Sequence, residues 1–171
     1  VLLCTKKENK TIDQYIHQYK HAGLYLDRRE AIDFISRRPE DPKAVSFMQT
    51  ALADPFDRLR NLALQRIDVK RTKLMTAVEP QLVEIAKKDA SRVTRSLALD
   101  KLGDTKNTSY KSLFQSMVND SSYTLSASAL TALDKVDNAT ALTEAKRLSK
   151  TNSKGNLSEA IGTVLILSLI H

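Results

Sequence analysis

The segment DPFDRLRNLALQRI, residues 54–67, has two further copies in the chain. DASRVTRSLALDKL, residues 89–102, aligns with it without a gap, and DSSYTLSASALTAL, residues 120–133, is the third copy. In each copy an Asp precedes an Ala by nine residues, and a Leu follows that Ala directly. A recurrence of this kind predicts a protein built from stacked helical repeats.

Two weaker copies of the same tail extend the repeat toward both ends of the chain. AIDFI, residues 31–35, and AIGTV, residues 160–164, repeat its spacing of apolar residues. The alanines of the five copies lie 32, 35, 31 and 31 residues apart, a period typical of stacked helix pairs. Because alanine is small, a neighbouring helix can approach closely at these positions, which are Ala31, Ala63, Ala98, Ala129 and Ala160.

The start of each strong copy predicts a helix N-terminus. Asp54, Asp89 and Asp120 are expected to be N-caps, because an aspartate side chain can accept hydrogen bonds from the free amides of a first helical turn. The arginines that follow, Arg60 and Arg95, are expected to donate hydrogen bonds within their own repeats.

Partner helices are predicted between the copies, where apolar residues recur three and four positions apart. The Asp41–Pro42 pair marks the start of one, and Pro80 is expected to start the next. Two more are indicated at residues 113–118 and 141–148, and residues 12–19 supply the first. The predicted fold is all-α, with about five antiparallel helix pairs stacked as a HEAT-like right-handed α-α superhelix.

The composition agrees with this fold class. The 171 residues are 42% hydrophobic but only 5% aromatic, with four Gly and four Pro, which favours helix over strand. The lone Cys4 excludes an internal disulfide and a cysteine cluster for zinc. No stretch is long and apolar enough for a membrane span, residues 161–170 included, so a soluble protein is expected and its compartment stays undecided.

The charge balance is basic, with 27 Lys and Arg against 20 Asp and Glu and a net charge of +7. Nucleic acid or an acidic membrane surface could therefore be partners. The excess is spread along the chain, and its densest stretch, residues 69–73, lies between two periodic segments. A solvated loop is the favoured interpretation of that stretch, and a nucleic-acid patch the less favoured one.

HQYKH, residues 17–21, holds two histidines at the spacing of the zincin motif, with Gln18 where the general-base glutamate of H-E-x-x-H belongs. Glu40 follows at the interval of a third zinc ligand, but it stands between prolines where helices are interrupted. At about 100° per residue, His17 and His21 lie opposite Ile12, Ile16 and Tyr19, so they should face solvent. We expect adventitious metal binding there at most.

No catalytic residue is predicted, since no G-x-S-x-G, P-loop or G-x-G-x-x-G motif occurs. The repeats do indicate a possible interaction surface. If Phe56, Leu59, Ala63 and Ile67 form the buried stripe of their helix, polar residues occupy the opposite side of successive repeats. These are Asn61, Gln65, Ser96, Asp100 and Thr131, with plain solvation as the alternative interpretation.

Residues 1–11, VLLCTKKENKT, and 18–31, QYKHAGLYLDRREA, resemble the join to the C-terminal helical domain of aminopeptidase-N-like (gluzincin) zinc metallopeptidases. The most specific element is Y-x-D-R-x-E-A, here Tyr25 to Ala31. The resemblance implies that residues 1–10 are the remnant of a preceding β domain or a linker. Residues 11–171 would then be a HEAT-like domain truncated from a longer chain.

The resemblance also implies a role. In such enzymes H-E-x-x-H and a downstream glutamate hold the zinc in an upstream domain, and no catalytic or cofactor residue of the family maps onto this chain. The helical domain caps the peptide chamber, so its partners would be the upstream domains and, indirectly, the peptide substrate. Two alternatives stay open: a free-standing HEAT-like protein-binding scaffold, and a nucleic-acid-binding HEAT-like domain.

Overall fold

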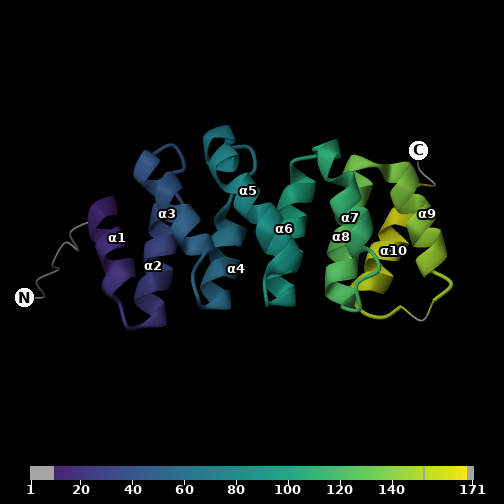
Figure 1. Ribbon diagram of the computed structural model, residues 1–171, viewed down its shortest axis with the longest axis horizontal. Helices are drawn as coiled ribbons and strands as arrows, with labels where there is room; N and C mark the ends of the chain where they lie inside the picture. The colour runs from purple at the N-terminus through teal and green to yellow at the C-terminus, as the bar shows by residue number, and fades with distance from the viewer. Residues whose placement is uncertain (1–9, 152, 169–171) are drawn as a thin grey trace, which may run out of the picture.

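The computed structural model describes residues 10–151 and 153–168, which form α-helices joined by short loops (Figure 1). The predicted all-α class is confirmed, and no strand occurs within the two described ranges. The sequence also allows a strand at residues 1–4, which lie outside those ranges. The elements are α1 (Ile12–His21), α2 (Tyr25–Ile35), α3 (Pro42–Leu52), α4 (Asp57–Arg66), α5 (Thr72–Lys88), α6 (Arg92–Asp104), the 3-10 helix η1 (Thr108–Tyr110), α7 (Lys111–Met117), α8 (Tyr123–Val136), α9 (Asn138–Leu148) and α10 (Asn156–Leu167).

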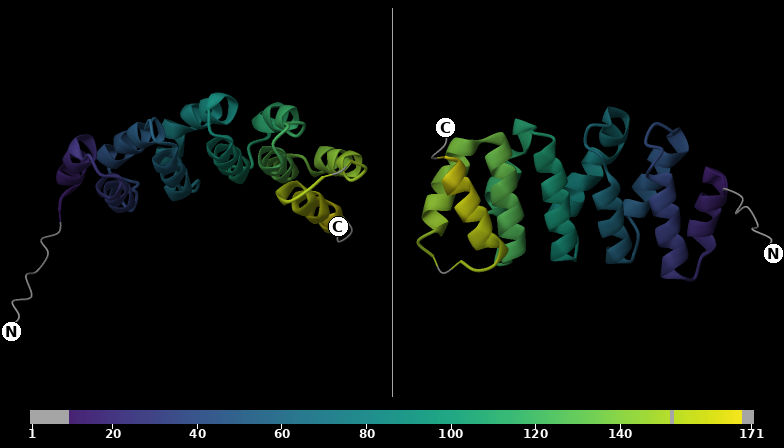
Figure 2. Two further views of the ribbon diagram at one scale, coloured as in Figure 1. Left: turned by 90° about the horizontal axis from the view of Figure 1, so that it is seen from below. Right: turned by 180° about the vertical axis from the view of Figure 1, so that it is seen from behind.

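The helices form two layers of a shallow arc. Figure 2 shows the odd-numbered helices in the outer layer and the even-numbered helices in the inner layer, on the concave side. Each odd helix packs antiparallel to the even helix that follows it, and the pairs succeed one another along the arc. The core lies between the layers and runs the length of the stack as one cluster of buried side chains.

The repeat alanines lie in the core between the helices. Ala31, Ala63, Ala98 and Ala129 are fully buried, and Ala160 is 8% exposed. The closest approach joins α6 to α8, where a methyl group added at Gly103 would lie 2.7 Å from the Cβ atom of Ala132. Small side chains therefore set how closely the inner helices stack.

The repeat aspartates are not N-caps, contrary to prediction. The N-cap residues are Phe56 for α4, Ser91 for α6 and Ser122 for α8. In each loop the aspartate lies two residues earlier, and its Oδ1 atom accepts a 2.8 Å hydrogen bond from the backbone N–H of that N-cap residue. An aspartate at this position closes a turn in the loop and is too far upstream to reach the amides of the first helical turn.

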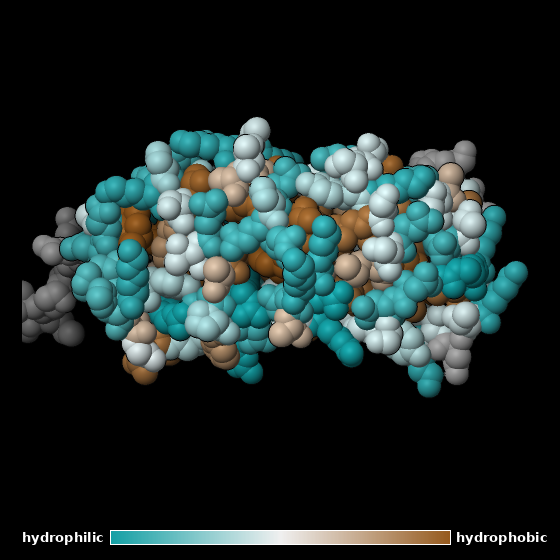
Figure 3. Space-filling model, viewed as in Figure 1, coloured by the Kyte–Doolittle hydropathy of each residue, from teal (hydrophilic) through white to brown (hydrophobic). Residues whose placement is uncertain are grey.

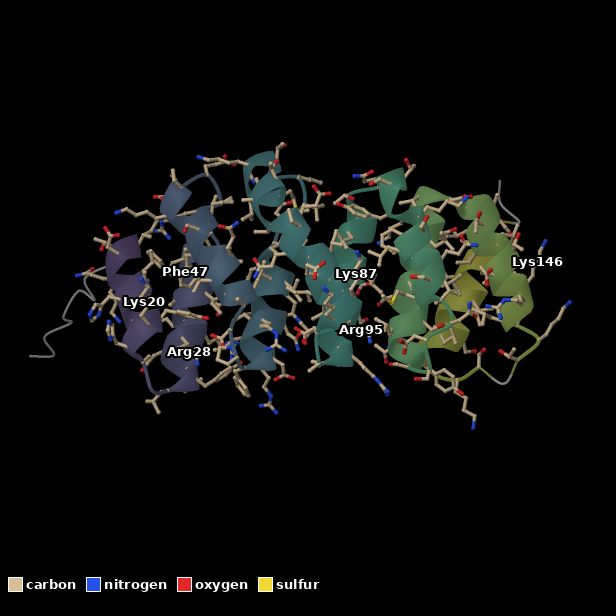
Figure 4. The ribbon with its side chains drawn as sticks, in the orientation of Figure 1. Lys20, Arg28, Phe47, Lys87, Arg95 and Lys146 are labelled. Atoms are coloured by element: carbon tan, nitrogen blue, oxygen red, sulfur yellow. The ribbon has the colours of Figure 1, made fainter. Side chains whose placement is uncertain are left out.

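The same aspartates link successive helix pairs through arginine. Arg60 binds both carboxylate oxygens of Asp89, at 2.7 and 2.8 Å. Arg28 binds Asp54, and Arg95 lies 3.8 Å from Asp120. We call these three contacts the arginine–aspartate ladder; Figure 4 shows Arg28 and Arg95 near the lower ends of their helices.

The ladder arginines also bond within their repeats, as predicted. Arg60 donates to the carbonyl oxygen of Asp54, and Arg95 to that of Ala86. Arg60 and Arg95 therefore each bond within their own repeat and contact the aspartate of the next one. A planar group with five N–H donors can do both at once.

The N-terminal rung has the most buried carboxylate of the three. Asp54 is 3% exposed, and its Oδ2 atom accepts hydrogen bonds from both Tyr19 and Arg28. Tyr19 belongs to α1, Arg28 to α2, and Asp54 to the loop before α4. One buried carboxylate therefore joins the first two helix pairs, and its charge is compensated by an arginine and two further donors.

Two helix predictions need correction. Pro80 does not start a helix: α5 begins at Thr72 and continues through Pro80, which is exposed and lacks the N–H for one backbone hydrogen bond. In α1 the buried residues are Tyr15 and Tyr19, while Ile12 and Ile16 are half-buried. The ring of Tyr15 stacks on that of Phe34 at 3.9 Å, which turns α1 toward its tyrosines.

Candidate binding surface on the inner face

The inner face is the solvent-facing side of α2, α4, α6, α8 and α10. It carries the residues predicted as an interaction surface. Asn61 and Gln65 lie on α4, Ser96 and Asp100 on α6, and Thr131 on α8. Gln65 is exposed, and Asn61, Asp100 and Thr131 are half-buried.

Ser96 departs from the expected exposure, because it is only 5% exposed. Its hydroxyl lies 2.6 Å from the hydroxyl of Ser128 on α8. The close approach of α6 and α8 at Gly103 draws the two serines together and removes Ser96 from solvent. Ser96 therefore forms part of the floor of the inner face.

Beyond this floor, α6, α8 and α10 enclose an open hollow of about 400 Å³. Three of the five predicted surface residues, Ser96, Asp100 and Thr131, line it. Small side chains leave the space open, since serine, threonine and alanine replace the long side chains usual on a helix surface. The hollow is therefore polar and shallow, and large enough to take a side chain or a short peptide segment.

The hollow carries two carboxylates, Asp100 from α6 and Glu159 from α10. Burial raises the pKa of the Asp100 carboxyl above its ordinary value, and a hydrogen bond from the Ser128 hydroxyl and the charges of Lys135 and Lys101 oppose that rise. The nearest lysines are engaged elsewhere: Lys101 donates to the carbonyl oxygen of Ile67, and Lys135 pairs with Asp104 at 2.6 Å. Within the described ranges, neither Asp100 nor Glu159 has an ion-pair partner.

The chemistry of this hollow is that of a cation acceptor. A partly desolvated carboxylate without a cation gains from an incoming ammonium or guanidinium group, which would lower its pKa. The surrounding hydroxyl groups, such as that of Thr163, add neutral hydrogen-bond partners. Nothing in the set supplies an activated nucleophile or a general base next to one.

The residues that α10 contributes, Glu159 among them, were missed by the sequence analysis. The fifth copy of the repeat, residues 160–164, is weak, so the sequence marks the polar stripe only as far as α8. Continuing the spacing of Ser96 and Asp100 through the α10 copy would have pointed to this region. Ser128 was missed because it adjoins the stripe rather than continuing it.

The histidine pair on α1 is exposed, as expected, and its two rings lie 4.3 Å apart. Glu40 has other partners: its carboxylate lies 3.6 Å from Arg71, and its carbonyl oxygen accepts a hydrogen bond from Lys73. No group of three or more His, Cys, Asp or Glu residues in the described ranges is arranged to hold a metal ion. His171 lies outside those ranges.

A scan of protein-family models finds no match to this chain, and a search of curated proteins finds none either.

Proposed function

We propose that the chain is a non-catalytic helical-repeat scaffold whose inner face binds a basic segment of a partner protein. The observation that carries this proposal is the hollow between α6, α8 and α10. Its carboxylates, Asp100 and Glu159, lack ion pairs among the described residues although the chain as a whole is basic. Stacked repeats bury their apolar faces against one another and leave extended surfaces of this kind for binding.

The test is a titration with a short oligolysine peptide, followed by NMR and by fluorescence anisotropy, with an oligoglutamine peptide as the uncharged comparison. We expect amide shifts in α6, α8 and α10. The double variant Asp100→Asn with Glu159→Gln should bind oligolysine roughly tenfold more weakly, because a charge-assisted hydrogen bond contributes about 1.5 kcal/mol or more.

The matched control removes the same charge at Asp27 and Asp57, in the first turns of α2 and α4. Asp27→Asn with Asp57→Asn should leave oligolysine affinity close to that of the unaltered protein. Equal losses in both double variants would mean that only net charge matters. Shifts confined to other helices would place binding elsewhere. Either result would reject the proposal.

A second candidate follows from the sequence resemblance: the non-catalytic C-terminal domain of a zinc aminopeptidase, with its zinc in an upstream domain. This candidate is favoured by the contacts that the resembling element, Tyr25 to Ala31, makes with the second helix pair. In this element Tyr25 contacts Phe56 with ring centroids 5.5 Å apart, Arg28 binds Asp54, and Ala31 is fully buried. The residues that resemble the family therefore join the first two helix pairs, where a preceding domain would attach.

Under this candidate the inner face would wall a peptide chamber and the fragment would have no peptidase activity. The deciding observation is whether the coding frame continues upstream into H-E-x-x-H. Zinc-dependent hydrolysis of an aminoacyl-p-nitroanilide by this chain alone would contradict both candidates, since each treats the chain as non-catalytic.

A further inference from the structure

The lower edge of the stack consists of the loops from odd to even helices and the first turns of α2, α4, α6 and α8. Large apolar side chains are exposed along it. Leu24 and Leu26 are each 68% exposed, Val93 is 53% exposed and Phe56 is 41% exposed. They occupy the starts of three successive even helices, so the exposure recurs with the repeat. In Figure 3 brown and tan atoms appear among teal and white ones in the left part of this edge.

The same edge carries cations beside these apolar residues. Arg58 stands two positions after Phe56, and Arg92 immediately precedes Val93. Lys150 and Lys154 lie in the loop between α9 and α10, which reaches the same edge (Figure 1). All four are exposed, and no ion pair involves them within the described ranges.

The carboxylates of this edge are largely neutralised. Asp54, Asp89 and Asp120 are bound by the arginines of the ladder. Asp27, Asp57 and Glu159 remain, and each lies in the first turn of a helix, where the helix dipole favours a negative charge. Among the described residues, unpaired cations therefore stand beside exposed apolar side chains at the starts of α4 and α6, where Arg58 follows Phe56 and Arg92 precedes Val93.

The shape of the edge also matters. The faces of the stack are curved, but the lower ends of the even helices lie at nearly one level (Figure 1). The left view of Figure 2 looks onto this edge from below and shows the whole arc of helices nearly end-on. A flat partner can therefore touch the starts of α2, α4 and α6 together, whereas it would touch a curved face at only one point.

We propose that this lower edge docks onto the surface of a bilayer that contains anionic phospholipid. Leu24, Leu26, Phe56 and Val93 enter the boundary between headgroups and acyl chains, and Arg58 and Arg92 bind lipid phosphates at the adjoining depth. No helix in the described residues has the length and apolar character to cross a bilayer. The contact is therefore peripheral, and it leaves the inner-face hollow open to a partner.

A bilayer fits these observations better than nucleic acid. A phosphate backbone would satisfy the arginines, but it offers no apolar phase to Leu24 and Leu26. A lipid surface satisfies both kinds of side chain at once. The two partners therefore differ in how strongly the leucines should contribute to binding.

The test is co-sedimentation of the purified protein with vesicles of phosphatidylcholine alone and of phosphatidylcholine mixed with phosphatidylserine. We expect binding to the mixed vesicles that weakens as salt is added. Leu24→Ser with Leu26→Ser should lower the partition coefficient at least tenfold. Arg58→Gln with Arg92→Gln should lower the partition coefficient roughly 25-fold, since each cation near an anionic surface raises it about fivefold.

Matched controls make the same kinds of substitution at other places on the protein. Arg37→Gln with Lys70→Gln removes two exposed cations from the opposite edge, and Ile166→Ser with Leu167→Ser removes two exposed apolar side chains near the end of α10. Both should bind mixed vesicles within about threefold of the unaltered protein, because their positions face away from the bilayer. Circular dichroism on all four variants checks that they remain folded.

Three outcomes would overturn the proposal. The first is no binding to mixed vesicles. The second is equal loss in the edge and control variants, which would mean that net charge alone drives binding. The third is duplex DNA that binds as tightly as the mixed vesicles and displaces the protein from them, with no effect of the leucine substitutions. That outcome would assign the edge to nucleic acid.

Discussion

At the residue scale, single positions decide how closely the helices stack. Gly103 shows this most clearly, because its Cα faces Ala132 on α8 with no room for a methyl group. Gly162 lies in α10 with nothing within 4 Å of the corresponding position. The two glycines therefore form a natural pair for comparison.

We expect Gly103→Ala to destabilise the protein by about 1 to 3 kcal/mol, because the added carbon would lie 2.9 Å from the backbone of Ala132 and force α6 and α8 apart. Gly162→Ala should stabilise it by about 0.5 to 1 kcal/mol, since alanine restricts the unfolded chain and favours helix. Urea unfolding of both variants measures the difference. A neutral Gly103→Ala would show that the two helices can separate at no cost.

The buried hydroxyl of Tyr19 gives the protein a pH dependence in the alkaline range. Burial raises the pKa of Tyr19 well above its ordinary value of 10.0, and the hydrogen bond to Asp54 adds to the rise while Arg28 opposes it. Tyr110 is shifted in the same direction, by burial and then by its hydrogen bond to Glu79. Folding therefore favours the neutral phenol at both sites.

Because the unfolded chain ionises first, this stability is present below about pH 10 and is lost as the pH rises above it. Tyr19→Phe should lower the free energy of unfolding at neutral pH by about 1 to 2 kcal/mol, since Asp54 loses a donor. Tyr19→Phe should also make the fall of the free energy of unfolding above pH 10 less steep. Urea unfolding across this range measures both effects, with Tyr110→Phe as the comparison. An alkaline slope unchanged by Tyr19→Phe would assign the dependence to other groups.

At the element scale, the helices begin in different ways. α1 starts with a capping box: the Thr11 side chain accepts from the backbone N–H of Gln14, and the Gln14 side chain accepts from that of Thr11 at 2.7 Å. The N-cap of α8 is Ser122, whose side chain makes no capping hydrogen bond. The loop before α8 is held by Asp120 instead.

Thr11→Ala should therefore weaken α1 by about 1 kcal/mol, whereas Ser122→Ala should change stability by only a few tenths of a kcal/mol. Hydrogen exchange of the first amides in each helix measures the local effect, and urea unfolding measures the global one. A larger loss in Ser122→Ala would mean that its hydroxyl has a role that the hydrogen bonds do not reveal.

At the scale of the whole molecule, the arginine–aspartate ladder ends before the stack does. Its rungs run from Arg28 to Asp120, and the position that would supply the next arginine is Ser126, whose hydroxyl donates to the carbonyl oxygen of Val118. Within the described residues the α9–α10 pair therefore has no rung of this kind, and its polar links to the preceding pair include a hydrogen bond from Arg147 to Asn119 and an ion pair between Lys111 and Asp137. In a stack of this kind, stability is the sum of each repeat and its neighbour contacts.

Amide exchange should report this asymmetry. We expect α9 and α10 to exchange faster than α1 and α2, although both pairs are terminal, because Arg28 and Asp54 tie the first pair to the second. Arg60→Ala should raise exchange in the central helices and leave α9 and α10 nearly unchanged. Equal protection of the two terminal pairs would show that the ladder adds nothing to neighbour coupling.

The repeat itself was readable from the residues, because its spacing reflects a local requirement. Each copy needs a small residue where the next helix crosses and apolar residues at helical intervals, and both appear in the letters between Ala63 and Ile67. The polar stripe was also partly readable, since Asp100 and Thr131 lie on one side of their helices. The partners of Asp54 were not, because Tyr19 and Arg28 come from other helices, and sequence spacing carries no signal of which side chains meet across a stack.

The sequence by itself determined the helical class, the period of the repeat and its small crossing residues, since these follow from propensity and from what each helix must bury. Only the tertiary structure decided that the aspartates bind arginines of the preceding pair, that Ser96 is buried, and that α10 completes the hollow around Asp100. The physical reason is that hydrogen bonds and burial depend on the distance between helices, and that distance is set by packing along the whole arc.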